Sequence, residues 1–339
     1  MRQSIFAPLA LSLAAGFQVA AELSVRTVYQ FASNDTWLEN IAVRSNGIIL
    51  ATEIGPPASL LAFDPSEETP EKVVLQTFTT VLGLSGITEA AHDVFYVTGA
   101  NTTSDNIEDP PKNATHLWRV DFTQSNNTNE PVITLIARPT APTGFNGLAA
   151  FNETIILASA SFQDSIFAVD TTSGYTWEAI KNDLMSDING IKVQDGYVYW
   201  TAGGNFCRAK LYSNVTSGAG EVITDSTSIN FDDFALGPDG FRLNTTVGSS
   251  TKYAYAATAV SNSIMQISFD EDGGMNQTAI IAGSEDSTEI AEPTGAAFGR
   301  GEGQLNKLYI TTGGGSGQNV DVNGVETAVG AQLLQIQLS

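Results

Sequence analysis

Cysteine, histidine and basic residues are scarce in this chain of 339 residues, and each shortage removes a class of chemistry. Cys207 is the only cysteine, so no disulfide can form within the chain and a large core must stabilise the fold. The two histidines, His92 and His116, stand away from the polar positions discussed below. This disfavours a Ser-His-Asp triad and a zinc or iron site with histidine ligands.

Positive charge is also in short supply, with 15 Lys and Arg against 37 Asp and Glu, and a formal net charge of −22. Such an acidic chain is repelled by phosphate backbones and by anionic lipid, so we expect neither nucleic acid nor anionic membrane surfaces as partners. Long apolar runs are missing beyond the N-terminus, so no later segment is expected to insert into a bilayer.

The N-terminus combines a basic residue, an apolar core and small residues, in MRQSIFAPLALSLAAGFQVAAELS. This pattern predicts a secretory signal peptide over residues 1–21, because the apolar core is too short for a membrane anchor. Residues 22–339 would then form one domain that enters the secretory pathway or is secreted. Eight Asn-x-Ser/Thr sequons support that route as candidate glycosylation sites: Asn34, Asn101, Asn113, Asn126, Asn152, Asn214, Asn244 and Asn276.

Six repeated units make up the remainder of the chain. Each has a polar residue, a short apolar strand, a polar turn, a second strand ending in small residues and a third strand, as in NGIKVQDGYVYWTAGGNFCRAKLYS. Fourth-strand candidates such as KVVLQTF and VITLIAR lie between units. The repeat predicts an all-β fold, a six-bladed β-propeller with four antiparallel strands per blade. Residues 23–31 would complete the last blade, and a β-sandwich or two small β-domains are the alternatives.

The first residue of each unit should lie at one mouth of the central channel, because the innermost strands run beside the axis. These six residues are acidic or polar: Glu39, Ser85, Asn146, Asn189, Asp233 and Thr294. Calcium binds carboxylate and amide oxygens, so Glu39, Asn189 and Asp233 are candidate ligands for Ca²⁺ or another divalent cation. Asn-Gly pairs such as Asn189-Gly190 are also common turns, which leaves a structural role open.

The order Glu, Asn, Asn, Asp at units one, three, four and five resembles the senescence-marker-protein/gluconolactonase family of six-bladed propellers. The resemblance implies a divalent metal held by Glu39, Asn189 and Asp233. It also implies that Asn146 contacts the substrate and that Asp233 acts as a base, so that the protein would be a metal-dependent lactonase. The chain departs from that family in lacking the Gly-Pro and the following Trp that usually come after the Glu.

The runs WLENIAVRSNG and PTGFNGL, together with the signal peptide, resemble a fungal secreted branch of the same superfamily. Some members of that branch are hetero-Diels–Alderases of tropolone–sesquiterpenoid meroterpenoid biosynthesis. The resemblance implies loss of water from a hydroxymethyl precursor to give a quinone methide, followed by cycloaddition to a humulene-type alkene. Glu39, Asn146 and Asp233 are the candidate catalytic residues. Candidate substrate contacts are polar or aromatic residues at and near the ring: Ser85, Asn189, Thr294, Trp37, Phe145, Trp200 and Phe234.

Two classes of function therefore stay open. One is an enzyme that acts on a small apolar molecule at the channel mouth, either a pericyclase, which we favour, or a lactonase. The other is a secreted propeller that binds its ligand without catalysis. Glu39 and Asp233 favour the enzyme, because two carboxylates at one mouth are costly unless a cation or a proton neutralises them.

Overall fold

A computed structural model describes residues 23–125, 130–238, 251–301, 303–316 and 319–338 of the chain. The predicted signal peptide and the sequons at Asn126 and Asn244 lie outside these ranges. Within them, no helix has both the length and the apolar character needed to cross a membrane.

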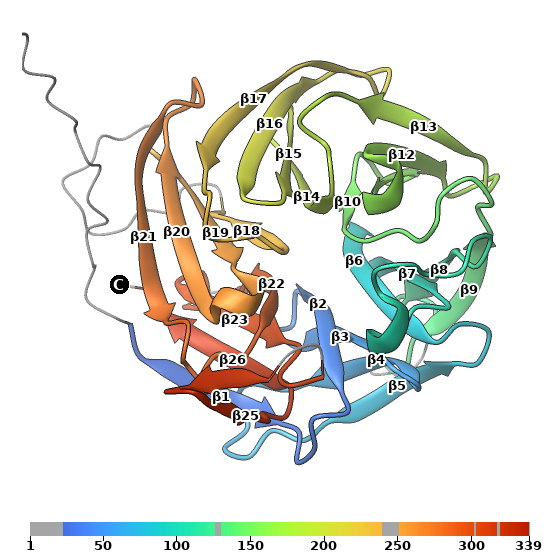
Figure 1. Cartoon of the computed structure of the whole chain (residues 1–339). Coiled ribbons are helices and arrows are strands. Elements are labelled where there is room, and N and C mark those ends of the chain that lie inside the picture. Colours follow the sequence, from blue (N-terminus) through green and yellow to red (C-terminus); the bar gives the residue numbers. More distant parts are fainter. Residues whose placement is uncertain (1–22, 126–129, 239–250, 302, 317–318, 339) are drawn as a thin grey trace, which may run out of the picture.

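Small antiparallel sheets are arranged radially around a central axis (Figure 1). Three of these sheets are built from four strands that follow one another along the chain. They are β10 (Leu148–Ala150), β11 (Ile155–Ala160), β12 (Ser165–Asp170) and β13 (Thr176–Lys181); β14 (Ile188–Gln194), β15 (Tyr197–Ala202), β16 (Asn205–Leu211) and β17 (Ser217–Asp225); and β18 (Phe234–Leu236), β19 (Lys252–Ala257), β20 (Ser263–Phe269) and β21 (Met275–Gly283).

A larger sheet holds the first eight strands after β1. One run of four is β2 (Trp37–Val43), β3 (Ile49–Ile54), β4 (Ala58–Phe63) and β5 (Val73–Phe78). The other is β6 (Gly83–Ala91), β7 (Val94–Ala100), β8 (His116–Asp121) and β9 (Val132–Ala137). Strands β3 and β6 pair only between Ile54 and Gly83, so a single contact merges the two runs into one sheet.

The two ends of the chain meet in the remaining four-stranded sheet. Its strands are β22 (Pro293–Phe298), β23 (Lys307–Thr312), β26 (Gln332–Gln337) and β1 (Val25–Gln30). Val25 pairs with Ile336 and Gln30 with Gln332, so the first strand closes the ring against the last, as predicted for residues 23–31. A short hairpin of β24 (Val320–Val322) and β25 (Val325–Thr327) stands apart from this ring.

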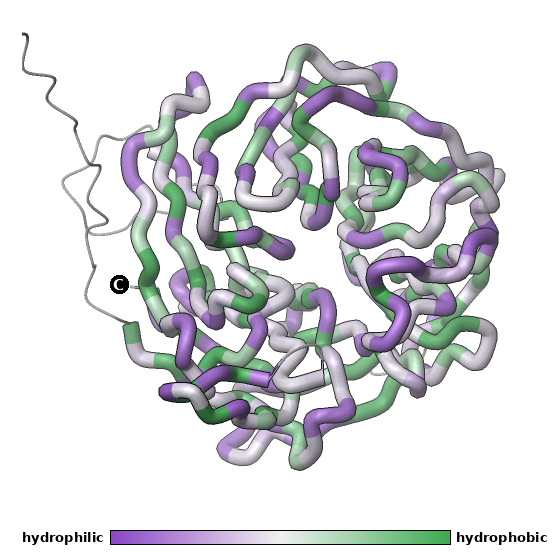
Figure 2. Tube along the Cα trace, viewed as in Figure 1, coloured by the Kyte–Doolittle hydropathy of each residue, from purple (hydrophilic) through white to green (hydrophobic). Residues whose placement is uncertain are grey.

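Apolar side chains from facing sheets form the core between them. Trp200 and Cys207 belong to one such cluster, and burial raises the pKa of the Cys207 thiol to about 12, so it stays an uncharged core residue. The outermost strands, such as β5, are largely exposed. Hydrophobic and hydrophilic residues are interspersed along the strands around the ring (Figure 2). This all-β, propeller-like arrangement confirms that part of the fold prediction.

Hydroxyl groups link the inner strands of neighbouring sheets at one level of the axis. The Thr201 hydroxyl accepts a hydrogen bond from Gly190 N at 3.0 Å and donates to Asp232 O, in the next sheet, at 2.6 Å. Thr52 repeats this arrangement with Asn40 N and Ser85 O. Each hydroxyl therefore bonds its own inner strand and the adjacent one.

The other junctions are bonded at the same level. Hydroxyls bridge two of them, from Ser159 to Asn189 O and from Thr311 to Glu39 O. Main-chain bonds from Gly86 N to Asn146 O and from Asp233 N to Thr294 O bridge the last two. The bonds define six equivalent pairs of successive residues: Glu39-Asn40, Ser85-Gly86, Asn146-Gly147, Asn189-Gly190, Asp232-Asp233 and Thr294-Gly295.

Irregular strand pairing changes the direction of the side chains at these six pairs of residues. The register shifts between Leu38 and Ile41 in β2, and corresponding shifts occur in β6, β14 and β22. A bulge of this kind lets two successive residues depart from the strict alternation of a strand. The first residue of a pair can then face the channel mouth while the second lies in the layer beneath it.

Candidate functional site

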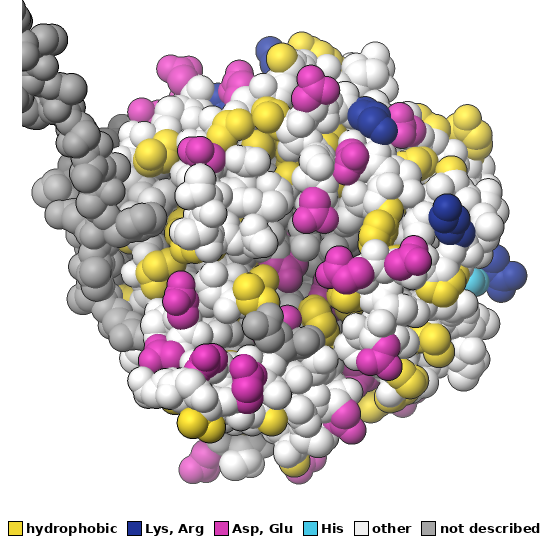
Figure 3. All heavy atoms as spheres, in the orientation of Figure 1, with side chains coloured by type: hydrophobic (Ala, Val, Ile, Leu, Met, Phe, Trp, Pro, Cys, Tyr) yellow, Lys and Arg dark blue, Asp and Glu magenta, His cyan; other side chains and the backbone are white. Residues whose placement is uncertain are grey.

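A cavity of about 300 Å³ opens at one mouth of the channel. The first residues of five of the six pairs line it: Glu39, Ser85, Asn146, Asn189 and Asp232. Figure 3 shows acidic side chains within and around the central hollow of this face. The structure thus brings together Glu39, Ser85, Asn146 and Asn189 as predicted, and adds Asp232.

Glu39 is the best-defined acid of this pocket. Its side chain is buried, and the indole Nε1 of Trp37 donates a hydrogen bond to Oε2 at 2.6 Å. The pKa of Glu39 is raised to about 7: burial is the main cause, the Trp37 hydrogen bond opposes the rise, and the nearby Asp233 carboxylate adds to it. Near neutral pH, a substantial part of the protein therefore carries a protonated Glu39.

Asp232 and Glu292 bring two more carboxyl groups to the same pocket. Burial is the main cause that raises the pKa of Asp232 well above its usual range, and Glu39, Asp233 and Glu292 add to it. A side chain at Gly313 would place its Cβ 2.9 Å from Oε2 of Glu292, so the glycine leaves room for this acid. These acids are buried close to one another, so ionising all of them would be costly. Some of them must therefore be protonated.

The two amide side chains offer acceptors that the protein itself does not use. Within the described residues, Oδ1 of Asn146 and Oδ1 of Asn189 are buried and accept no hydrogen bond, and the same holds for Oδ1 of Asp232. Ser85, in contrast, donates its hydroxyl to Phe145 O at 2.6 Å. Buried polar atoms without partners are costly, so these oxygens are available to a ligand that donates hydrogen bonds.

Large apolar side chains form part of the pocket lining, which we term its apolar wall. Trp37 and Phe145 line it as predicted, and four further apolar side chains, which were not predicted, are Ile54, Leu84, Ile107 and Phe162. Phe162 lies on the 3-10 turn η2 (Ser161–Gln163) and is 49% exposed. An exposed aromatic ring at the rim, beside buried acids, makes the pocket suited to a molecule with one apolar and one polar part.

The structure corrects the position predicted for the acid of the fifth unit. Asp233 is absent from the pocket lining, because it is the second residue of its pair and lies in the layer below, against Lys192 and Asn40. Asp232 stands where Asp233 was expected. The sequence could have indicated this, because Asp232-Asp233 can be aligned with Asn189-Gly190. In that alignment Asp232, not Asp233, is the equivalent of Asn189.

Three other predicted contacts do not line the pocket. Thr294 is fully buried and donates its hydroxyl to Leu38 O at 2.6 Å. Trp200 is a core residue whose Nε1 donates to Leu184 O at 2.8 Å. Phe234 packs in the core with its ring 5.0 Å from that of Phe206. Each sits near the ring in sequence, but its side chain points between the sheets rather than to the mouth.

The predicted metal ligands Glu39, Asn189 and Asp233 do not fit a divalent cation. Both carboxylate oxygens of Asp233 lie 2.6 Å from Nζ of Lys192, so an ammonium group takes the space beside them. In the part of the chain that the structure describes, no three His, Cys, Asp or Glu side chains are placed to hold a metal. We therefore derive no chemistry from a bound metal.

Radial sheets with a polar pocket on their axis define the chain as a propeller-type protein. Its relatives include a protein of Phoma sp. named "Putative hetero-Diels-Alderase", 26% identical over 320 residues that cover 82% of this chain and 84% of the relative. Another, "Putative hetero-Diels-Alderase asR5" of Sarocladium schorii, is 27% identical and covers 89% and 81%. The chain thus resembles these proteins over most of its length, while no family model matches it.

Solved structures share the fold at low identity. The luciferin-regenerating enzyme superposes with a TM-score of 0.63 at 12% identity, covering 93% of this chain and 95% of that protein. The calcium-binding protein regucalcin from Agrobacterium tumefaciens gives 0.60 at 12%, covering 95% and 97%. These likenesses extend over the whole ring and concern the architecture alone.

Proposed function

We propose that the protein is a hetero-Diels–Alderase-type enzyme. It removes water from a hydroxymethyl-bearing tropolone or phenol to form a quinone methide, and joins this to a humulene-type sesquiterpene by a [4+2] cycloaddition. The observation that carries the proposal is the pairing of Glu39, a buried acid, with an apolar wall in one pocket. The similarity to proteins with this name over most of the chain supports it.

Water loss requires a proton donor. Glu39 gives its proton to the hydroxymethyl oxygen, the carbon–oxygen bond breaks, and water leaves. The adjacent ring hydroxyl returns its proton to the Glu39 carboxylate, so the acid is restored and the products are one quinone methide and one water molecule. Trp37 holds the Glu39 carboxyl in place through its indole hydrogen bond. Asp232 is the second acid of the pocket and can hydrogen-bond the ring oxygens.

Cycloaddition requires no further proton transfer. The quinone methide carbonyl oxygen and its exocyclic carbon bond to the two alkene carbons, and no atom leaves. The apolar wall with Trp37, Phe145 and Phe162 holds the hydrocarbon partner against the heterodiene, which lowers the entropic part of the barrier. Hydrogen bonds from the pocket amides and acids to the carbonyl oxygen, where negative charge develops, lower it further.

The proposal is tested with purified full-length protein and two substrates, each with and without a chelator. One assay offers a hydroxymethyl tropolone with humulenol, and the other offers an aldonolactone. We expect cycloadduct above the uncatalysed background, unaffected by chelation, and no lactone turnover. Chelator-sensitive lactone hydrolysis without cycloadduct would make the protein a lactonase, and binding of either compound without turnover would make it a binding propeller; both results overturn the proposal.

The rate should depend on pH through Glu39. Because the proton donor is its protonated form and its pKa is about 7, we expect kcat/KM to be level below pH 7 and to fall up to tenfold per pH unit above it. Asp233 is the acid that raises the pKa of Glu39, and Lys192 is the cation beside Asp233; Asp232 and Glu292 are the other acids of the pocket. A rate that instead rises through pH 7 would show that a carboxylate base, not an acid, limits the reaction.

We also propose that the eight-stranded sheet counts as two blades, which makes a single six-bladed domain over residues 22–339. Residues 1–21 are proposed as a signal peptide, so that the protein acts in the secretory pathway or outside the cell. Among the sequons in described residues, five asparagines are exposed and Asn101 is half-buried: the exposed ones are Asn34, Asn113, Asn152, Asn214 and Asn276. Their exposure is compatible with glycosylation.

A further inference from the structure

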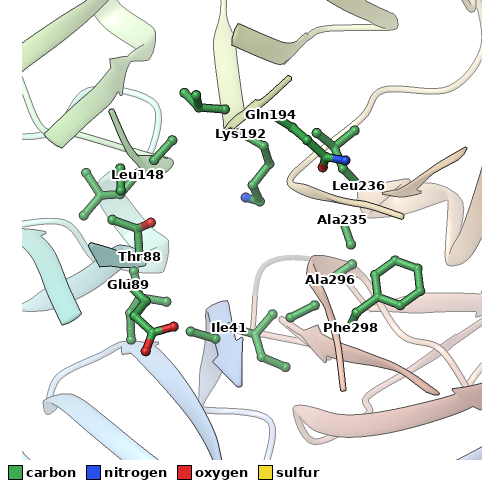
Figure 4. Close-up of a pocket in the computed structure, with 16 residues that line it drawn as sticks. Ile41, Thr88, Glu89, Leu148, Lys192, Gln194, Ala235, Leu236, Ala296 and Phe298 are labelled. Carbon is green, nitrogen blue, oxygen red and sulfur yellow. The ribbon is translucent and has the colours of Figure 1, made fainter. Parts of the chain in front are cut away.

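The channel is divided into two cavities that share no lining residue. The one described above holds the acids, and a second, of about 460 Å³, opens toward the other mouth between the inner strands. Figure 4 shows this second cavity, with the Lys192 side chain reaching inward from its wall. The layer between the cavities is formed by the second residues of the six pairs.

Four of those six residues are glycines, and the chain is too crowded there for side chains. A Cβ on Gly86 would lie 2.4 Å from Asn146 O, and one on Gly190 would lie 2.2 Å from Oδ1 of Asp233. The other two members, Asn40 and Asp233, are therefore the only second residues with side chains. Asn40 Nδ2 donates to Oδ2 of Asp233 at 2.8 Å, so these side chains meet within the layer.

Lys192 completes this layer. Its Nζ lies 2.6 Å from both carboxylate oxygens of Asp233 and 5.3 Å from the centre of the Phe234 ring. Phe234 N also donates to Oδ1 of Asp233 at 2.7 Å. Asp233 is almost fully buried, whereas the Lys192 side chain is 26% exposed. The carboxylate thus receives four hydrogen bonds, and two of them come from the ammonium group.

A divalent cation would have to compete with this arrangement. Calcium requires six to eight oxygen ligands at about 2.3–2.6 Å, and magnesium requires six at about 2.0–2.1 Å. Binding at Asp233 would displace the ammonium group from both oxygens and then hold two cations close together inside the channel. Lys192 already supplies the positive charge that the Asp233 carboxylate needs, and it is fixed to the chain.

We propose that Lys192 is the resident cation of the channel, a positioning residue that takes the place a metal would otherwise fill beside Asp233. It fixes the floor beneath the mouth pocket through Asp233 and Asn40. Because its ammonium group contacts both oxygens of Asp233, this carboxylate is not available as a metal ligand. This inference concerns cation binding alone and is independent of which reaction the pocket catalyses.

The test replaces Lys192 with Met, which keeps the length of the side chain and removes the charge. Ca²⁺ and the luminescent probe Tb³⁺ are titrated into the wild-type and variant proteins by calorimetry, emission and thermal unfolding. We expect no saturable binding at the channel of the wild type. K192M should melt at a lower temperature, gain a single saturable cation site, and recover part of the lost melting temperature when Ca²⁺ is added.

Three further variants make the result specific. K192R keeps the charge and should gain no site, and K192M/D233N removes both charges and should lose the site that K192M gains. Lys252→Met removes the partner of Asp195 in an ion pair nearer the surface and should also gain no site. If the wild type binds Ca²⁺ stoichiometrically and Glu39→Gln abolishes this, or if K192M gains no cation site, the proposal is overturned. The wild-type titration decides the matter even if K192M does not fold.

Discussion

Replacing Glu39 with Gln is expected to slow cycloadduct formation by about 10²- to 10⁴-fold, the usual contribution of a general acid. Glutamine has nearly the same shape, and its amide oxygen can still accept the hydrogen bond from Trp37 Nε1 that Glu39 accepts at 2.6 Å. It cannot give a proton to the leaving hydroxyl. The loss should therefore fall on kcat, with a small change in KM, and the variant should lose the decline in rate above pH 7.

Glu89→Gln is the matched control. Glu89 is also a channel carboxylate, but it lines the second cavity, where it pairs with Arg300. Its replacement should leave the rate within about twofold, an allowance that corresponds to less than 0.5 kcal/mol in the barrier. Thermal unfolding of both variants checks that they are folded. An E39Q enzyme that keeps wild-type kcat and the same pH profile would remove Glu39 from the mechanism.

Replacing Asp93 with Ala should destabilise the fold by about 3–5 kcal/mol, because it leaves a buried charge without its main partner. The Arg44 side chain is 2% exposed, and its Nε and Nη2 lie 3.1 and 3.0 Å from the two carboxylate oxygens of Asp93. Its guanidinium also stacks 3.7 Å from the centre of the Phe122 ring. This cluster connects β2 and β3 to the turn between β6 and β7.

Asp195→Ala provides the comparison for this effect. Asp195 lies in the corresponding turn between β14 and β15, with φ of 53° against 56° for Asp93, so alanine meets the same backbone strain at both positions. Asp195 forms an ion pair with Lys252 nearer the surface, and such pairs contribute at most about 1 kcal/mol to the free energy of unfolding. Denaturant unfolding should show a loss larger by roughly 2–4 kcal/mol for D93A. Equal losses would mean that strain, not the buried charge, dominates.

Much of the architecture could be predicted from the sequence because the repeated order of strands and turns determines it. Apolar strands in a recurring order, with polar turns between them, favour small antiparallel sheets arranged around one axis. The same regularity located Glu39, Ser85, Asn146 and Asn189, since each opens a unit and each lines the pocket. These positions depend on the order of the units and on little else.

The remaining site residues depend on local geometry that the repeat does not encode. Asp232 and Asp233 are adjacent and chemically identical, and only the hydrogen bond from Thr201 to Asp232 O shows which is equivalent to Asn189. Glu292 comes before the first residue of its unit. It lines the pocket from a left-handed backbone conformation, with φ of 54°. Trp200 was misplaced for a similar reason, because the direction of a side chain near a strand end changes with a single residue of register.

The pairing of β1 with β26 also determines when folding can be completed. Among the strands that the structure describes, β1 is made first and its partner β26 last, about 300 residues later. Until then, β1 and the edge of the unfinished ring have no partner and can pair with other chains. Contacts between such distant parts of a chain form slowly. Chaperone supply during synthesis, rather than the stability of the finished ring, should therefore limit the yield of this protein in a foreign host.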